Sequence, residues 1–161
     1  MLLGRSVIFT AGAFIVFASG YLIMRGQKRP KHCVFCHPLE RVVYEDENFI
    51  AFHDIKPDAQ LHLLVIPRKH YGTIKELSAE DMPMVKRMYE IGQQLLEERG
   101  FIENTARFGF HRPPFNSIHH LHLHCLGLPF KSRAERMFPK NGSLWFMPAE
   151  NLITAMSDQS N

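Results

Sequence analysis

HLHLHCL, at residues 120–126, alternates histidine with residues that prefer the protein interior. Successive side chains of a β-strand point to opposite faces, so this repeat predicts a strand with its imidazoles on one face and Leu121, Leu123 and Cys125 in the core. A slip of one residue would exchange the two faces, which fixes the register of the strand. The segment therefore predicts a row of imidazoles presented by a central strand.

The spacing of this row limits its chemistry. The outer two histidines are rooted about 13 Å apart on an extended strand, too far to hold one metal ion together. Two neighbouring histidines can share a zinc ion if a further ligand comes from elsewhere. The alternative is chemical, with the middle ring acting as a nucleophile. One histidine in a strand is usually only a structural polar residue, whereas three in register, followed by Gly127, indicate function.

Charge and length limit the class of protein. The chain has 161 residues, and about 130 of them follow the first thirty, enough for one domain with its own core. Beyond residue 31 there are fourteen basic and sixteen acidic residues, a net charge of about −2. Because a nucleic-acid binder usually carries a basic face, no extended nucleic acid is expected as a partner.

An uncharged, largely apolar stretch runs from residue 6 to 24 and is long enough to cross a bilayer as a helix. It is longer than the apolar part of a signal peptide and lacks an A-x-A-like end, so an uncleaved anchor is favoured over a cleaved leader. Four basic residues follow the stretch and one precedes it, which places the domain on the cytosolic side. The sequence predicts an anchor with a basic flank at 1–31, a domain at 32–161, and a single-pass membrane protein facing the cytosol. Without the segment the protein would be soluble, cytoplasmic or nuclear.

The rest of the chain predicts an α+β domain with an antiparallel sheet. One long helix is expected between Ser78 and Gly100, because Met84, Met88, Ile91 and Leu95 recur at helical spacing. Ser78 or Asp81 would cap its start and Gly100 its end. Strands are expected at 41–45 and 49–54, as a hairpin around Asp46, and at 61–67 and 106–111.

Two short features outside the histidine row also indicate chemistry. Paired prolines at 113–114 predict a loop that delivers Ser117 to the histidine strand, where its hydroxyl and turn amides form a phosphate-binding corner. Cys33 and Cys36 form a C-x-x-C pair, which favours metal binding over a disulfide framework. The pair is also compatible with two free thiols.

Four blocks together resemble the histidine triad (HIT) superfamily of nucleotide hydrolases and transferases. They are SIHHLHLHCLG (117–127), FHDIKPDAQLHLLVIPRKHYGTIKEL (52–77), GFHRPPFNSIHHLHLH (109–124) and SLWFMPAENLI (143–153). The last two are most similar to the Hint branch, type three. The resemblance covers residues 33 to about 155 and implies a HIT-like antiparallel sheet with one long helix, here preceded by the predicted transmembrane helix.

The resemblance implies roles for the site residues. His122 matches the nucleophile that attacks the α-phosphorus and carries the nucleotide as a phosphohistidine. His124 and Ser117 match positions that contact the phosphate and its leaving group, and His120 and His62 match histidines that support the nucleophile.

The resemblance also implies a nucleotide site and a metal site. Asp54 matches the acidic residue that accepts the ribose hydroxyls, with Ile55 and Asn116 as further nucleotide-binding positions. A zinc site, structural rather than catalytic, would use Cys33, Cys36, His70 and His120. His120 is then needed both for the metal and beside the nucleophile, and the sequence leaves that choice open.

The implied reaction is hydrolysis of adenosine 5'-monophosphoramidate-type substrates to AMP and an amine, with no cofactor required for catalysis. A purine nucleotide and a second copy of the chain, in a homodimer, are the implied partners. The loop at 112–115 is rigid where the Hint pattern is glycine-rich, which bears on substrate preference. The alternatives are a membrane-tethered nucleotide-binding or scaffolding protein with weak incidental hydrolysis, and a dinucleoside polyphosphate hydrolase.

Overall fold

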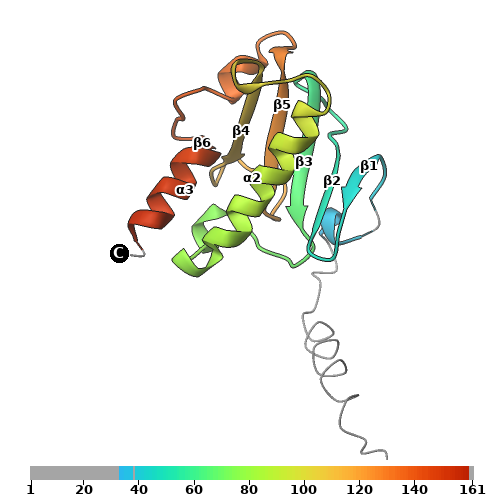
Figure 1. Cartoon of the computed structure of the whole chain (residues 1–161). Coiled ribbons are helices and arrows are strands. Elements are labelled where there is room, and N and C mark those ends of the chain that lie inside the picture. Colours follow the sequence, from blue (N-terminus) through green and yellow to red (C-terminus); the bar gives the residue numbers. More distant parts are fainter. Residues whose placement is uncertain (1–32, 38, 160–161) are drawn as a thin grey trace, which may run out of the picture.

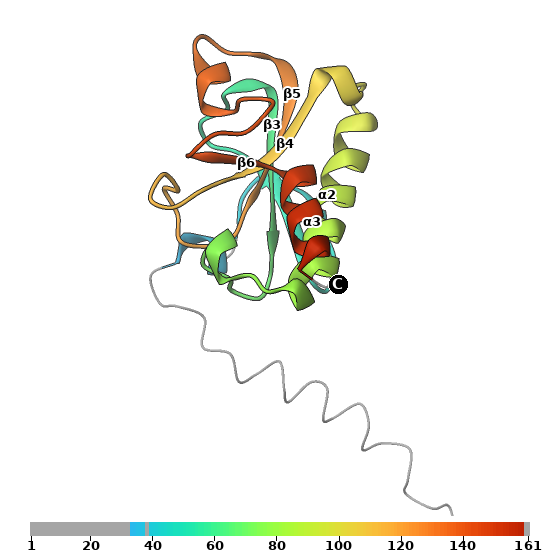
Figure 2. The same cartoon turned by 90° about the vertical axis from the view of Figure 1, so that its left-hand side faces the viewer.

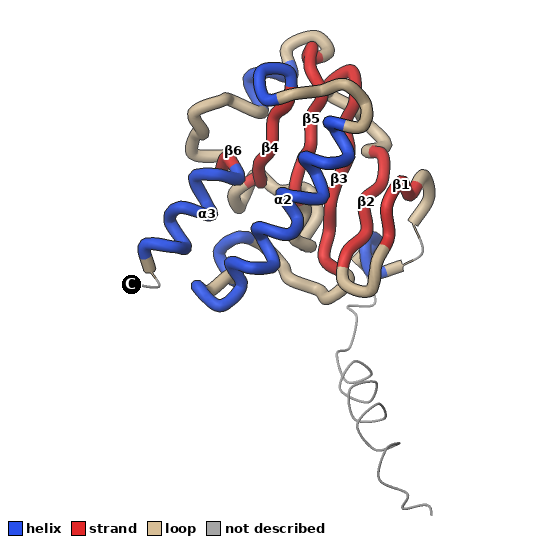
Figure 3. Tube along the Cα trace, viewed as in Figure 1, coloured by secondary structure: helices blue, strands red, loops and turns tan. Residues whose placement is uncertain are grey.

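The computed structural model describes residues 33–37 and 39–159 and contains one six-stranded antiparallel sheet of order β1-β2-β3-β5-β4-β6 (Figure 1). Helices α2 and α3 cover one face of the sheet (Figure 2). Figure 3 separates helices, strands and loops along the same trace. The strands are β1 Val42–Glu45, β2 Phe49–His53, β3 Ala59–Pro67, β4 Ala106–His111, β5 Leu123–Phe130 and β6 Phe146–Pro148. The helices are α2 Met82–Glu97, α3 Ala149–Asp158 and the short 3-10 turns Val34–Cys36, Ile74–Glu76, Ala79–Asp81, Glu103–Thr105 and Ala134–Met137.

The predicted hairpin is present as β1 and β2. Its turn is built on Asp46, whose Oδ1 accepts hydrogen bonds from the backbone N–H groups of Asn48 at 2.8 Å and Phe49 at 2.7 Å. The carboxylate therefore satisfies donors that the turn leaves outside the ladder, as expected of an aspartate at this position. The strand predicted at 61–67 begins two residues earlier, at Ala59, and the one at 106–111 has the predicted bounds.

Helix α2 is the predicted long helix and packs across β3 and β5. Its buried side chains include Met88, Ile91 and Leu95, which follow the predicted stripe. Ser78 and Asp81 form a capping box around the 3-10 turn that precedes the helix. Gly100 has a φ of 81°, a left-handed conformation that glycine adopts at low cost, and it ends the helix as predicted.

Strand β5 lies at the centre of the sheet, but it begins only at Leu123, so the prediction of one strand over 120–126 is partly wrong. The ladder between β3 and β5 ends at the pair Val65 and Leu123. Beyond it the backbone N–H of Leu121 donates to the carbonyl of Tyr71 at 2.6 Å, outside the sheet. The alternation of side chains nevertheless persists through this segment, since Leu121, Leu123 and Cys125 all join the core beneath α2.

The structure contains a second helix, α3, whereas the sequence predicted only one long helix. It follows directly from β6, a three-residue strand that pairs with β4 through Phe110 and Met147, among other residues. Leu152 and Met156 of α3 are buried in the core that α2 also covers. A three-residue strand is too short to show a period of its own, which is why the end of the sheet could not be read from the sequence.

The predicted transmembrane helix and the single-pass membrane localisation are not supported and are corrected here. None of the helices within residues 33–37 and 39–159 is long and apolar enough to cross a bilayer. The longest, α2, has 16 residues, or about 24 Å, against a hydrocarbon core of about 30 Å, and one of its faces is charged. Residues 6–24 lie outside the described residues. The described residues form an antiparallel sheet with helices, so the α+β part of the predicted fold class is confirmed.

Candidate active site

His122 lies directly before β5, and a backbone carbonyl two residues earlier in the chain holds its ring. Its Nδ1 donates a hydrogen bond to the carbonyl oxygen of His120 at 2.6 Å, and the side chain is only 7% exposed. Because a carbonyl accepts only, the proton sits on Nδ1 and the lone pair on Nε2. Burial lowers the pKa of His122, which keeps the ring neutral at physiological pH. The residue therefore offers an unprotonated ring nitrogen.

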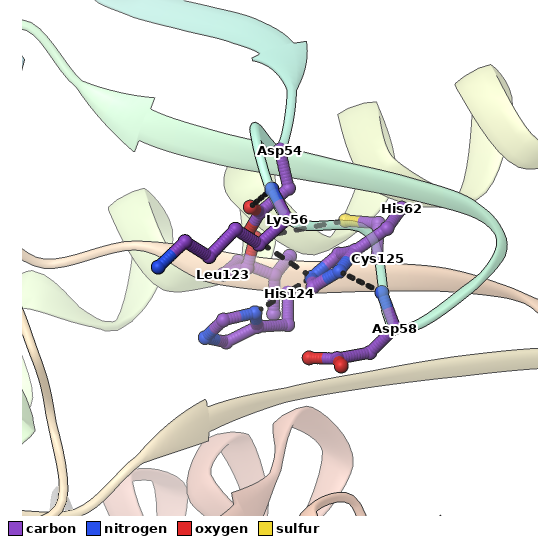
Figure 4. Close-up of polar contacts among 7 residues, drawn as sticks. All are labelled: Asp54, Lys56, Asp58, His62, Leu123, His124 and Cys125. Carbon is purple, nitrogen blue, oxygen red and sulfur yellow. Dashed lines mark hydrogen bonds and ion pairs between the residues drawn. The ribbon is translucent and has the colours of Figure 1, made fainter. Parts of the chain in front are cut away.

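His62 on β3 and His124 on β5 form a hydrogen-bonded pair, the histidine chain, shown in Figure 4. The backbone N–H of Asp58 donates to His62 Nδ1 at 3.2 Å, so His62 carries its proton on Nε2. That proton is donated to His124 Nδ1 at 2.9 Å, which leaves the proton of His124 on its Nε2. Burial is the main cause that lowers the pKa of both rings. His124 Nε2 is a buried donor without a partner among the described residues.

His111, at the end of β4, is a further histidine of the site that the sequence analysis missed. Its ring packs edge-on against His124, with centroids 4.6 Å apart. Its Nε2 is buried and lacks a partner in the part of the chain that the structure describes. Burial lowers the pKa of His111, as for its neighbours. The only sequence signal was its position, at the end of a strand that leads into the loop before Ser117.

Asp54, directly after β2, points toward the histidine chain. Its Oδ2 lies 3.6 Å from His62 Nε2, and its Oδ1 accepts a hydrogen bond from the backbone N–H of Lys56 at 2.7 Å (Figure 4). The neighbouring Ile55 is 79% exposed. A carboxylate beside an exposed apolar residue suits a sugar and a base, one by hydrogen bonds and the other by packing.

Asn116 and Ser117, the two remaining predicted site residues, lie in the loop between β4 and β5, and Asn116 is half-buried. Asn116 lines a cavity of about 10 Å³, enough for one water molecule, together with His111, His120 and His122. Its side-chain amide donates to the carbonyl of Ile118 at 3.3 Å. Ser117, the next residue of the loop, is exposed to solvent.

Cys33, Cys36, His70 and His120 form the thiol–imidazole cluster, whose four ligand atoms all lie within 4.8 Å of one another. His120 Nδ1 lies 3.3 Å from Cys33 Sγ and 3.5 Å from Cys36 Sγ, and His70 Nδ1 lies 3.4 Å from Cys36 Sγ. A tetrahedral zinc ion with ordinary bond lengths separates its sulfur and nitrogen ligands by about 3.6 Å. The residues therefore fit a zinc ion in both donor type and spacing.

His120 connects this cluster to the nucleophile candidate. Its Nε2 bonds the carbonyl of Pro67 at 2.9 Å, which places the ring proton on Nε2 and turns the Nδ1 lone pair toward the thiols. Its own carbonyl accepts the hydrogen bond from His122. The geometry makes the two roles of His120 compatible, because its side chain faces the cluster while its backbone carbonyl holds His122.

The chain is similar to several known proteins. The family model of the scavenger mRNA decapping enzyme C-terminal binding domain matches residues 32–137. The chain is 45% identical over 130 residues to the bifunctional adenosine 5'-phosphosulfate phosphorylase/adenylylsulfatase HINT4 of Arabidopsis thaliana, covering 75% of this chain and 88% of the relative. It is 38% identical over 132 residues to the adenosine 5'-monophosphoramidase HINT3 of Mus musculus, covering 76% and 79%.

The chain belongs to the HIT superfamily. A solved HIT family hydrolase of Legionella pneumophila superposes with a TM-score of 0.55 at 33% identity, over 63% of this chain and 96% of that one. A histidine triad protein of Clostridium difficile superposes with a TM-score of 0.59 at 28% identity, over 65% and 99%. The predicted HIT family and the prediction of a hydrolase are confirmed.

Proposed function

We propose that this HIT protein is a nucleotide phosphoramidase that hydrolyses adenosine 5'-monophosphoramidate-type substrates to AMP and an amine. The observation that carries the proposal is the hydrogen bond from His122 Nδ1 to the His120 carbonyl, which leaves a buried, neutral Nε2 as the nucleophile. Relatives named adenosine 5'-monophosphoramidase, and the purine nucleoside phosphoramidase of Escherichia coli at 33% identity over 88 residues, support this class of reaction.

The reaction has two displacements. In the first, His122 Nε2 forms a bond to the α-phosphorus while the bond from phosphorus to the amine nitrogen breaks, and the amine leaves with one added proton. In the second, water attacks the nucleotidyl-histidine, the bond from phosphorus to His122 breaks, and AMP is released. Dividing one difficult displacement into two easier ones is the gain from nucleophilic catalysis.

The remaining site residues bind and orient the nucleotide. His124 donates from Nε2 to a phosphoryl oxygen, where negative charge develops in the transition state, because its Nδ1 is already occupied by His62. Asp54 accepts hydrogen bonds from the ribose hydroxyls, and Ile55 packs against the base or sugar. Ser117 and Asn116 contact the phosphate and its leaving group from the loop that precedes the histidines.

The thiol–imidazole cluster takes no part in these steps. Cys33, Cys36, His70 and His120 would hold a zinc ion, which links the N-terminal turn to the end of β3 and to the segment before β5. This is a structural contribution, and catalysis requires no cofactor in this proposal. The homodimer remains a prediction, to be checked by light scattering on the purified chain.

The test compares wild type with His122→Ala and His122→Asn, using a fluorogenic AMP phosphoramidate and following amine release. We expect both variants to lose at least about a thousand-fold in kcat, because the residue that forms the covalent bond is gone, while AMP still binds. His119→Asn is the matched control, since this neighbouring histidine is exposed. Turnover of either variant within tenfold of wild type would refute the mechanism. A wild type that binds AMP without any turnover would favour the scaffolding alternative, and cleavage of a dinucleoside polyphosphate alone would favour that hydrolase.

A further inference from the structure

Each phosphoramidate cleavage needs a proton for the departing amine and a base for the attacking water. The site holds several imidazoles, and their hydrogen-bond partners decide which nitrogen can give up or accept a proton. His122 is excluded for the leaving step, because its Nε2 is bonded to phosphorus as the amine departs and its Nδ1 donates to a carbonyl.

The histidine chain cannot deliver this proton. Its far end is the backbone N–H of Asp58, which donates to His62 Nδ1 and is not an acid in water. His62 donates its Nε2–H to His124 Nδ1 in a hydrogen bond, and the proton stays on His62. If His124 gave up its Nε2 proton, no proton could follow along the chain and an imidazolate would remain. His124 is therefore a hydrogen-bond donor and not an acid.

His111 differs from the histidine chain at the nitrogen that bonds the backbone, whereas its unpartnered Nε2 is a feature that it shares with His124. The ring forms a hydrogen bond with the backbone of Met137, and this bond favours the protonated ring, which raises its pKa against the effect of burial. Its Nε2 has no partner among the described residues although it is buried. Buried nitrogens of this kind usually have a partner, so an unpaired one in a site indicates a ligand or a proton-transfer role.

The ring of His111 lies beside that of His124 and close to His122. Its ring lies 4.6 Å from that of His124, which itself lies 4.9 Å from the ring of His122. Phe138 and Phe146 pack against the other sides of His111, at 5.1 and 5.7 Å, and fix the orientation of the ring. His111 and His122 also line the same small cavity.

We propose that His111 is the general acid and base of the reaction. This inference rests on the proposed phosphoramidase function. In the first step His111 acts in its protonated form, which is the minor form at neutral pH because burial lowers the pKa of the ring. It transfers its Nε2 proton to the amine nitrogen as the bond from phosphorus to nitrogen breaks, which yields the neutral amine. In the second step the neutral Nε2 takes a proton from the water that attacks phosphorus, and the bond to His122 breaks. The His111 imidazolium is thereby restored, so protons balance over one turnover.

Leaving-group basicity gives the sharpest test. The full chain, as wild type, His111→Asn and His111→Gln, is assayed with two AMP phosphoramidates that differ only in the amine, one a strongly basic alkylamine and one a weakly basic arylamine. Only the alkylamine needs a proton donor as it departs. We expect the variants to lose about a hundred-fold or more in kcat/KM for the alkylamide and less than tenfold for the arylamide, the usual scale of general acid catalysis. His53→Asn, on β2, is the matched control and should leave the ratio unchanged.

A pH profile provides a second readout. Because burial lowers the pKa of His111, wild-type kcat/KM for the alkylamide should fall as the pH rises through a value below the ordinary histidine pKa of about 6.5, and the variants should lack that limb. The charged or titratable groups that face His111 are His124, His122, His62 and Asp58. These four groups are unchanged in the variants, so a fall in kcat/KM with pH that is present in wild type and absent in the variants is due to His111.

The outcomes separate this inference from the function on which it rests. Equal losses for both substrates, or an unchanged pH profile, would overturn the role of His111 while wild-type turnover still supported the phosphoramidase. No wild-type turnover of either substrate would overturn both. Thermal unfolding of each variant is measured in parallel, and Gln serves as the second polar replacement if Asn lowers the Tm by more than a few degrees.

Discussion

We predict that the thiol–imidazole cluster binds one zinc ion per chain and that this ion stabilises the folded state. The contacts of 3.3 to 3.5 Å between sulfur and nitrogen lie close to the value of about 3.6 Å for a tetrahedral ion, so little rearrangement is needed to bind it. Addition of zinc to metal-free protein should bind one ion per chain. At a free concentration a thousand times the Kd, the folded state gains about 4 kcal/mol. For a domain of this size the Tm should rise by about 10 to 20 °C.

The decisive variant is Cys36→Ser, because Cys36 Sγ contacts both His70 and His120. A serine hydroxyl is a poor zinc ligand, so the variant should bind less than a tenth of an equivalent under the same conditions and show a Tm that does not respond to the metal. Cys125→Ala is the control. That thiol lies in the core beneath α2, so its loss should lower the Tm but leave one zinc ion per chain.

The assay combines a chelator-competition titration with thermal unfolding, and amine release is followed at 25 °C with and without chelator. Turnover should persist within a few-fold after metal removal, because no step uses the ion. Retention of a full equivalent of zinc by Cys36→Ser would refute the assigned ligand set. Complete loss of turnover on metal removal, with the protein still folded, would refute the structural role.

Three further predictions concern stability and nucleotide binding. Burial lowers the pKa of His120 to about 4, so between about pH 6.5 and 4 the unfolded metal-free chain binds more protons than the folded one. The free energy of unfolding should therefore fall by about 3 kcal/mol across that window for this residue alone, and a flat urea-denaturation profile from pH 7 to 4.5 would contradict it. Gly109→Ala should cost about 1 to 3 kcal/mol, because the added carbon would lie 2.4 Å from the Phe146 ring and 2.5 Å from the Met147 carbonyl; an unchanged Tm would argue against this packing. Asp54→Asn should raise KM for the AMP phosphoramidate about tenfold and the KM of its 2'-deoxy analogue much less, and equal effects on both would exclude contact with the ribose.

Much of the fold follows from local patterns. The spacing of Met88, Ile91 and Leu95 places α2 on the sheet, and the alternation at Leu121, Leu123 and Cys125 predicts which side chains join the core. These patterns hold because burial of apolar side chains depends on a period that neighbouring residues share. The same reasoning extended the histidine strand too far, because alternation of side chains continues where the backbone ladder has already ended at Leu123.

The candidate site was predictable only in part. The resemblance to the HIT superfamily named Cys33, Cys36, His70 and His120, and the structure brings these four together. His111 carried no comparable signal. Its proposed role depends on β4 lying beside β5, so that its ring meets His124, and on the backbone of Met137, in a later turn, bonding the ring. A strand-terminal histidine looks the same in the sequence whether or not such neighbours exist.

By itself, the sequence determined the family, the core-facing residues and the identity of the groups that can perform chemistry. Tertiary structure decided which nitrogen of each histidine carries its proton. That depends on partners far along the chain, such as His62 for His124, 62 positions away, and the Cys33 thiol beside His120, 87 positions away. The physical reason is that a neutral imidazole has one donor and one acceptor, and only its folded surroundings determine which nitrogen takes each role.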